Sequence, residues 1–436
     1  MRLPEQGLSP DQVRGRLGGA GAHDVDWRRG RGWSLVYDSP SWHSELVDEA
    51  AARFSHENAL SHSAFPSAQE FESQVVSMAA SVVAPGVRSY GVFTSGGTES
   101  LMVAVKAYRD HSAAGRDEIV LPSTAHPGFG KAADYLGLRV RLVPVAADGL
   151  PDPADVIAAM GERTAMVGLS APCFPYGVVD PIAPIARAAA ERGIGVHVDA
   201  AMGGLFLPFL SPGDTPGGEP VRFGLDVDGV TSVSVDLHKY GYGAKGASVL
   251  LFATNELRHA AYHVWTGWSG GAYAASGVLG TRSVGAAAAA WTAMSALGVA
   301  GYRGLVTEVM ATARRLQDGM AEQGLSVIGH PPMGVFAVTS EQVSIPAVAA
   351  RMDDRGWWID TQEPPPSLHF VVFPRHAGVA ADFLRDLGDV YPQAEEGSAE
   401  HTTASSYGVM IRGGELTDQL LREHLDRRFD GPSDGD

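Results

Sequence analysis

Between residues 70 and 255, short apolar runs alternate with segments of helical periodicity. The apolar runs occur at 90–94, 119–121, 140–145, 165–169, 194–198, 230–237 and 247–252. Helical segments lie between several of them, for example at 100–110 and 182–192. Such alternation is typical of strands that are joined by helical crossovers and therefore run side by side in one direction. The sequence thus predicts an α/β domain with a mainly parallel central sheet.

The remainder of the chain predicts smaller units on either side of this domain. Residues 1–32 are rich in Gly, Arg and Asp and predict a loosely ordered lead-in, whereas 41–57 have helical spacing. After about residue 304, a long helix and then mixed elements predict a smaller α+β domain. The expected divisions are an N-terminal segment 1–62, a large domain 63–300, a small C-terminal domain 301–430 and a disordered tail 431–436. Surface or flexible segments are expected at 211–220 and 394–404.

Charge and cysteine content exclude several classes of function. The formal net charge is -17, so a nucleic-acid or anionic membrane surface is a poor partner. The only cysteine, Cys173, rules out an intrachain disulfide. No secretory signal opens the chain, and the uncharged stretch 284–302 is rich in Ala and Gly, which favours a buried helix over a membrane span. We therefore expect a cytoplasmic protein.

The segment TSGGTES (94–100) predicts a seat for a phosphate group. It follows an apolar run and opens a helix, and its glycines let the backbone approach an anion. Ser95 and Thr98 add hydroxyl donors beside Gly97, while the helix N-terminus adds free N–H groups and a partial positive charge. Gly–Gly turns before helices are common, so this segment alone does not establish function.

Two charged residues follow later strands. Asp199 ends the run at 194–198, where the carboxyl ends of parallel strands form ligand sites, and could pair with a pyridinium nitrogen. Lys239 follows the run at 230–237 beside His238, and a desolvated lysine there could form a Schiff base. The alternatives are a helix-capping Asp199 and a surface Lys239.

The order of these segments favours one cofactor. His126, after the run at 119–121, could stack on a cofactor ring. A phosphate seat at Gly97, a stacking residue at 126, a carboxylate at 199 and a lysine at 239 follow the order of fold-type I enzymes. These enzymes use pyridoxal 5'-phosphate (PLP). We therefore expect a PLP-dependent transferase fold with PLP held as a Schiff base on Lys239, and no metal.

Longer segments closely resemble the sphingosine-1-phosphate lyase family, from about residue 37 to about residue 421. The matching segments are NALSHSAFPS (58–67), FTSGGTESLMVAVKAYRD (93–110), AHPGFGKAADYLG (125–137), PCFPYGVVDPI (172–182), HVDAAMGG (197–204), SVSVDLHKYGYGAKGASVLLF (232–252), GGAYAASGVLGTRS (270–283) and PPPSLHF (364–370). The HKYGY and GGAY segments are fairly specific to this family, whereas the first active-site elements also occur in the wider amino acid decarboxylase group.

The resemblance implies a role for each matching residue. PLP would be carried by Lys239, its ring nitrogen paired by Asp199 and its ring covered by His126. Its phosphate would be held by Ser95, Gly97, Thr98, His238 and, from the neighbouring subunit of a homodimer, Thr281. Tyr37, Ser61, His62 and Lys245 would line the end of the site that takes a substrate phosphate.

The departures from the family pattern concern the substrate. The family histidine of NPLHPD falls on Ser61, and His62 stands where proline is usual. Ala201 replaces a cysteine, Cys173 and Tyr176 replace glutamine and histidine, and Ala275 and Ser276 replace Ser and Pro. We expect these changes to surround the substrate and to leave the cofactor site intact.

The resemblance implies retro-aldol cleavage of a β-hydroxy amine, with or without a phosphate, to an aldehyde and an amine. The base for the β-hydroxyl could be Lys239, Tyr240 or a phosphate oxygen. An amino acid decarboxylase, a related lyase of a specialised pathway and a non-catalytic PLP-binding protein remain alternatives.

Overall fold

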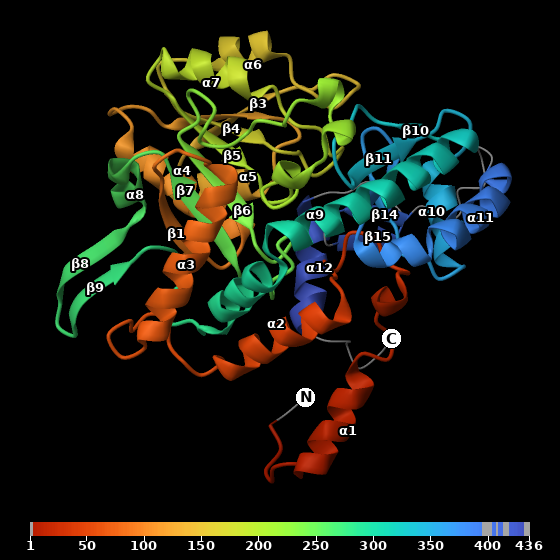
Figure 1. Cartoon of the computed structure of the whole chain (residues 1–436), viewed down its shortest axis with the longest axis horizontal. Helices are drawn as coiled ribbons and strands as arrows, with labels where there is room; N and C mark the ends of the chain where they lie inside the picture. The colour runs from red at the N-terminus through yellow and green to blue at the C-terminus, as the bar shows by residue number, and fades with distance from the viewer. Residues whose placement is uncertain (1–2, 395–402, 407–408, 413–417, 431–436) are drawn as a thin grey trace.

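The computed structural model describes residues 3–394, 403–406, 409–412 and 418–430, and a seven-stranded sheet forms its centre (Figure 1). The sheet order is β1-β7-β6-β5-β4-β2-β3. The strands are β1 (Tyr90–Thr94), β2 (Glu118–Pro122), β3 (Arg139–Val143), β4 (Thr164–Ser170), β5 (Gly195–Asp199), β6 (Ser232–Asp236) and β7 (Ser248–Phe252). Only β7 in this sheet runs against its neighbours. The prediction of a mainly parallel sheet is confirmed, and every predicted apolar run overlaps a strand.

Both faces of this sheet are covered by helices. Alternate residues of β2 point to opposite faces, so Ile119 packs in one hydrophobic cluster and Val120 in another. The cluster of Ile119 includes residues of α4 (Gly97–His111), α5 (Gly128–Leu136) and α8 (Asn255–Ala261). The cluster of Val120 includes residues of α3 (Pro66–Val83), α6 (Pro153–Ala159) and α7 (Ile182–Ala190). Burial on both faces explains why these strands form continuous apolar runs.

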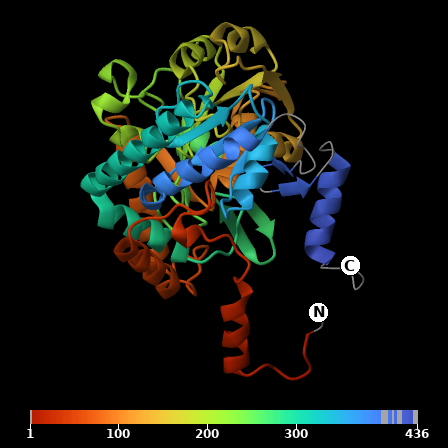
Figure 2. The same cartoon turned by 90° about the vertical axis from the view of Figure 1, so that its right-hand side faces the viewer.

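A second, antiparallel sheet of four strands lies beside the first, in the teal-to-blue part of the chain (Figures 1 and 2). Its order is β10-β11-β13-β12, and α10 (Ile345–Asp353) and α11 (Ala380–Val390) belong to the same part of the chain. The strands are β10 (Ser326–Val327), β11 (Val335–Thr339), β12 (Asp360–Gln362) and β13 (Ser367–Val371). The pair β14 (Thr403–Ser406) and β15 (Val409–Arg412) and the helix α12 (Asp418–Asp430) follow. This mixture fits the expected smaller α+β part.

The long helix α9 (Gly285–Glu322) connects the two parts. It packs against α2 (Ser41–Arg53), α3 and α11, and its backbone is interrupted at Gly298, whose φ is 55°. This left-handed conformation is one that glycine adopts without the steric cost of a side chain. The domain boundary that we place at residue 300 falls inside this helix. Within the described residues, no helix combines the length and apolarity needed to cross a membrane.

The expectation of a loosely ordered lead-in is wrong for residues 10–20. Pro10–Ala20 form the helix α1, which starts with Pro10 in its first turn and a capping box between Ser9 and Gln12. None of its residues is buried, and it stands away from the body of the protein (Figures 1 and 2). The composition did not indicate this helix, because the helix is stabilised by capping at its N-terminus and has no buried apolar face. The expected tail 431–436 and most of the expected connection 394–404 lie outside the described residues.

Candidate active site

A cavity of about 340 Å³ lies at the carboxyl ends of β5 and β6 and at the start of α4. Its lining residues come from four separate stretches of the chain: Ser95, Gly96, Gly97, Thr98, Glu99, Leu101, His126, Asp199, Ala201, Asp236, His238, Lys239, Lys245 and Gly246. Open α/β sheets place their ligands at this edge, where strand ends and helix starts meet. The volume is that of a small-molecule site.

The phosphate seat has the backbone geometry that an anion requires. Gly96 has a φ of 151°, which disfavours any other residue, and α4 begins at the next residue with its N–H groups free. A side chain at Gly97 would meet the carboxylate of Asp236 at 3.0 Å, so the absence of a side chain keeps the seat open. The N–H of Ser95 is already bonded to the Glu99 carboxylate at 2.6 Å. This part of the cavity therefore fits the phosphate of PLP.

Lys239 lies on the turn after β6, with its side chain largely buried. Its Nζ lies 3.1 Å from Oδ2 of Asp236. The neighbouring His238 donates from Nδ1 to the carbonyl of Ala247 at 2.8 Å, which leaves Nε2 facing Asp236 at 3.8 Å. Burial lowers the pKa of His238. Lysine and histidine thus both approach Oδ2 of one carboxylate beside the phosphate seat.

Asp199 and His126 form the other side of the cavity. Asp199 is buried at the end of β5, and its Oδ1 accepts the N–H of Ala201 at 3.0 Å. Burial raises the pKa of Asp199, and the charges of His126 and Lys239 oppose this effect. The ring of His126 accepts the N–H of Gly128 at Nδ1, at 3.0 Å, and burial lowers its pKa. A buried carboxylate beside a neutral imidazole suits a flat ligand with a cationic ring nitrogen.

Sequence reasoning missed two carboxylates that line the same cavity. Asp236, at the end of β6, is 2% exposed and accepts the hydroxyl of Ser248 at 2.7 Å. Burial alone would raise its pKa, but the charges of Lys239 and His238 hold the pKa below its ordinary value. Asp236 could have been found from its place at a strand end, which matches that of Asp199. Glu99 could not, because two of its backbone donors, Val278 and Leu279, come from a distant segment.

The remaining predicted residues do not line this cavity in the single chain. Tyr37 donates to the sulfur of Met202 at 3.1 Å, next to the cavity residue Ala201. His62 is half-exposed and lies 3.5 Å from Glu72. Ser61 and Thr281 also lie outside the cavity lining.

The segments that carry Ser61, His62 and Thr281 nevertheless lie together. The N–H of Ala59 donates to the carbonyl of Arg282 at 2.9 Å, and Arg282 reaches the same Glu72 that His62 approaches. Any contact that brings Thr281 into another subunit's cavity would bring the segment of Ser61 and His62 close to it as well.

The substituted positions of the family pattern do not all surround the cavity. Ala201 lines the cavity, whereas Cys173 is buried and does not line it. Tyr176 donates its hydroxyl to the carbonyl of Pro364 at 2.8 Å. The neighbouring carbonyl of Phe174 accepts from Nε2 of His369 at 2.9 Å. The change at Tyr176 therefore concerns the contact between the two sheets, not the cavity wall.

Comparisons with known proteins find a matching family model, sequence relatives and structural neighbours. Residues 40–207 match the model of aminotransferase class-V. Sphingosine-1-phosphate lyase 1 of Rattus norvegicus is 35% identical over 93% of this chain and 73% of its own length. The sphingosine-1-phosphate lyase structure from Burkholderia pseudomallei superposes with a TM-score of 0.89 and 32% identity, covering 99% of this chain and 98% of that one. Glutamate decarboxylase of Lactobacillus brevis, 18% identical, covers 91% of this chain and 95% of its own with a TM-score of 0.78, and shares the fold.

Proposed function

Because the chain belongs to the sphingosine-1-phosphate lyase family, we propose that it cleaves a phosphorylated long-chain β-hydroxy amine into an aldehyde and a phosphorylated amine. It is a PLP-dependent lyase with the fold-type I architecture. The observation that carries the proposal is the convergence of the phosphate seat, His126, Asp199 and Lys239 on one cavity. The decarboxylase alternative is not favoured by these relatives.

The residues of the cavity divide the work of holding PLP. Gly97 and Thr98 at the start of α4, with His238, would hold its phosphate, and Lys239 would carry it. Asp199 would face the ring nitrogen and His126 the ring. When bound, PLP supplies an electron-accepting ring that takes up the electron pair of the bond broken beside the substrate amine. Asp199 would keep the ring nitrogen protonated, which would make the ring a better acceptor.

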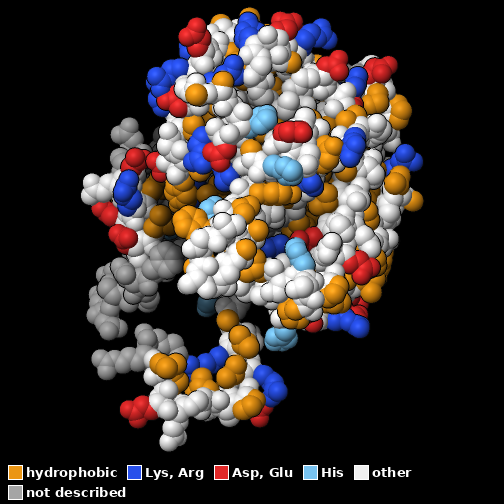
Figure 3. Space-filling view, turned by 90° about the vertical axis from the view of Figure 1, so that its left-hand side faces the viewer, with side chains coloured by type: hydrophobic (Ala, Val, Ile, Leu, Met, Phe, Trp, Pro, Cys, Tyr) orange, Lys and Arg blue, Asp and Glu red, His pale blue; other side chains and the backbone are white. Residues whose placement is uncertain are grey.

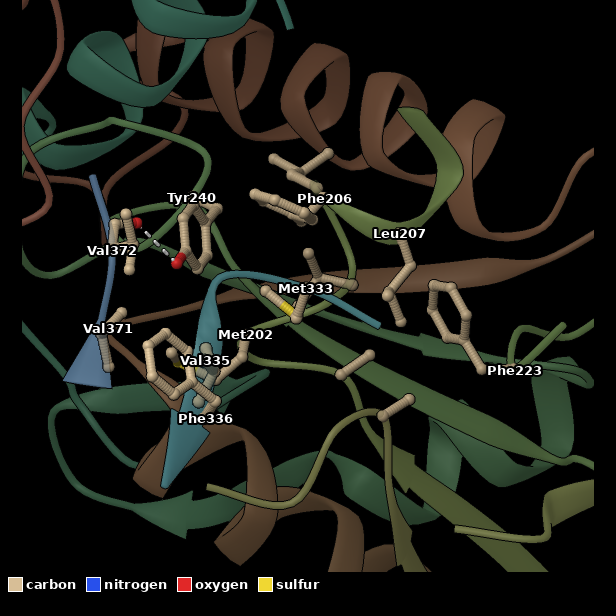
Figure 4. Packing of buried hydrophobic residues seen from close by; sticks show 14 of the residues in the cluster. Met202, Phe206, Leu207, Phe223, Tyr240, Met333, Val335, Phe336, Val371 and Val372 are labelled. Carbon is tan, nitrogen blue, oxygen red and sulfur yellow. Dashed lines mark hydrogen bonds between the residues drawn. The ribbon is translucent and has the colours of Figure 1, made fainter. Parts of the chain in front are cut away.

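The proposed cleavage needs a proton removed from the β-hydroxyl and a proton delivered to the amine-bearing carbon. The bond between these two carbons breaks, the hydroxyl carbon leaves as the aldehyde, and no water is consumed. Tyr240 does not fit as the base, because its hydroxyl donates to the carbonyl of Val372 at 2.9 Å inside the core (Figure 4). Burial also raises its pKa well above the ordinary value. Lys239, which already lies in the cavity, is the stronger candidate for moving a proton.

We further propose a homodimer in which each subunit completes the site of the other. The hairpin β8 (His263–Trp268) and β9 (Gly271–Ala275) projects from the body (Figure 1), and the face that bears it is turned to the viewer in Figure 3. Val264, Trp265 and Trp268 on this hairpin are more than half exposed, at 62%, 56% and 58%. Exposed aromatic side chains on a projecting element are typical of a surface that a partner covers. The segment up to Thr281 continues directly from this hairpin.

The proposed function predicts the products of a direct assay. Purified protein with PLP should convert a sphingosine-1-phosphate-type substrate to a long-chain aldehyde and aminoethyl phosphate, both measured by mass spectrometry. Release of carbon dioxide from amino acids without any aldehyde would contradict the lyase proposal. Cleavage of β-hydroxy amino compounds other than long-chain ones would instead support a lyase of a specialised pathway. The cytoplasmic location also remains a proposal, which localisation of the tagged protein in cells would test.

The lowered pKa of Lys245 leads to a prediction of how binding of a phosphorylated substrate depends on pH. Burial and then the charge of Lys239 lower the pKa of Lys245, so its ammonium loses its proton at a lower pH than that of a free lysine. The charged form is present below this lowered pKa and disappears as the pH rises through it. We therefore expect KM for the phosphorylated substrate to rise in the alkaline range, where the substrate phosphate is already fully ionised.

The matched comparison is Lys245→Arg, because arginine stays charged throughout this range. The KM of the wild type should therefore rise relative to that of the variant as the pH increases, and any titration of the substrate itself cancels in this ratio. Parallel KM profiles for the two proteins would contradict a role for the Lys245 charge in binding the substrate phosphate.

A further inference from the structure

The carboxylate of Glu99 joins two segments that are far apart in the sequence. On the first turn of α4, it accepts the N–H of Ser95 at Oε2, at 2.6 Å. Its Oε1 accepts the N–H groups of Val278 at 2.6 Å and Leu279 at 3.1 Å. Glu99 is 9% exposed, so these three backbone donors satisfy a carboxylate that is largely removed from water.

Each of the two segments belongs to a different part of the proposed site. Ser95 opens the phosphate seat of its own cavity. Val278 and Leu279 precede Thr281, the residue that we propose to reach the partner's cavity. The other end of that segment is held where Arg282 reaches Glu72 at 2.6 Å. Thr281 is thus exposed and lies between two anchored parts of its segment. One is held by Glu99 and the other by the contact of Arg282 with Glu72.

The close fit between these segments makes the connection stiff. A side chain at Gly277 would lie 2.5 Å from Oε1 of Glu99, so the backbone approaches the carboxylate as closely as glycine allows. Hydrogen bonds to an ionised acceptor are shorter and stronger than neutral ones. Because both segments are bonded to one carboxylate, a shift of the seat moves the acceptor on which Val278 and Leu279 depend.

We propose that Glu99 is a positioning residue that couples occupation of one phosphate seat to the placement of the segment that completes the partner's site. This inference rests on the proposed function, since it requires both PLP and the homodimer. Coupling of this kind is reciprocal, so PLP strengthens the dimer by the same factor by which dimerisation strengthens PLP binding. The contacts of Glu99 are the source of this coupling between PLP binding and dimerisation.

The test measures the dimer dissociation constant by analytical ultracentrifugation, with and without saturating PLP. In the wild type, PLP should tighten the dimer by about tenfold or more. In Glu99→Ala the ratio of the two constants should fall close to one, and Glu99→Gln, which keeps the volume but not the charge, should give an intermediate ratio. Glu162→Ala removes an exposed glutamate of the same type and should keep the wild-type ratio. Inorganic phosphate in place of PLP should show the same pattern more weakly.

The ratio separates coupling from simple stabilisation. If Glu99 only stabilised the fold, its variants would weaken the dimer equally with and without PLP, and an unchanged ratio in both variants would overturn the inference. Glu99→Gln gives this answer even where Glu99→Ala does not fold. A wild type that binds no PLP or remains a monomer would instead contradict the proposed function.

Discussion

Lys239→Ala should leave PLP without covalent attachment and lower kcat/KM by at least about 10³-fold. The substitution removes the amine that lies 3.1 Å from Asp236 beside the phosphate seat. It removes the attachment point and the group best placed to move a proton, and proton transfer alone contributes on the order of 10²–10⁴-fold. Borohydride reduction followed by mass spectrometry measures the covalent attachment of PLP, and steady-state kinetics measure the loss of kcat/KM.

Two other lysines make this test specific. Lys131→Ala removes an exposed lysine of α5 and should change neither quantity. Lys245 also lines the cavity, so it could react with the cofactor if Lys239 were not the attachment residue. Recovery of PLP on a Lys245 peptide from the wild-type protein would therefore contradict the assignment of Lys239.

The central sheet could be predicted from the sequence because burial on both faces leaves a continuous apolar run at each strand. The antiparallel direction of β7 could not be predicted, since a buried strand has the same composition in either direction. The break of α9 at Gly298 also escaped prediction, because the residues on both sides of it continue the helical pattern. Local composition records burial, while chain direction depends on pairing with distant strands.

The cofactor end of the site could be predicted further than the substrate end. Residues that follow strand ends converge by the topology of a parallel sheet, so Asp199 and Lys239 could be expected to meet. Glu99 could not be recognised, because its function depends on N–H groups about 180 residues away along the chain. The substrate end was predicted from family segments alone, and of its residues Lys245 lines the cavity of one chain, whereas Tyr37, Ser61 and His62 do not. Thr281, predicted for the cofactor phosphate, also lies outside this cavity. Residues that act between subunits leave no periodic pattern in a single sequence.

Asp199→Asn should lower kcat by about 10²–10³-fold while PLP stays attached to Lys239. The asparagine Oδ1 can still accept the N–H of Ala201, so the local backbone should hold, but the negative charge proposed to face the ring nitrogen is lost. Removing one preorganised electrostatic group from a dry site typically costs this much. After reduction with borohydride, the variant should contain as much covalently bound PLP as the wild type. The value of kcat from the same preparation gives the loss of activity. Asp353→Asn, at an exposed aspartate of α10, should match the wild type in both measurements.

The double variant Lys239→Ala/Asp199→Asn decides whether these two residues serve one chemical step. In the proposed assignment, Asp199 would strengthen an electron acceptor that Lys239 positions, so removing the charge should cost little once the lysine is gone. Groups that act as a unit show such non-additive losses. The double variant should therefore be about as slow as Lys239→Ala alone, within a few-fold. A full additional loss of about 10²-fold would mean that Asp199 and Lys239 contribute independently to the cleavage.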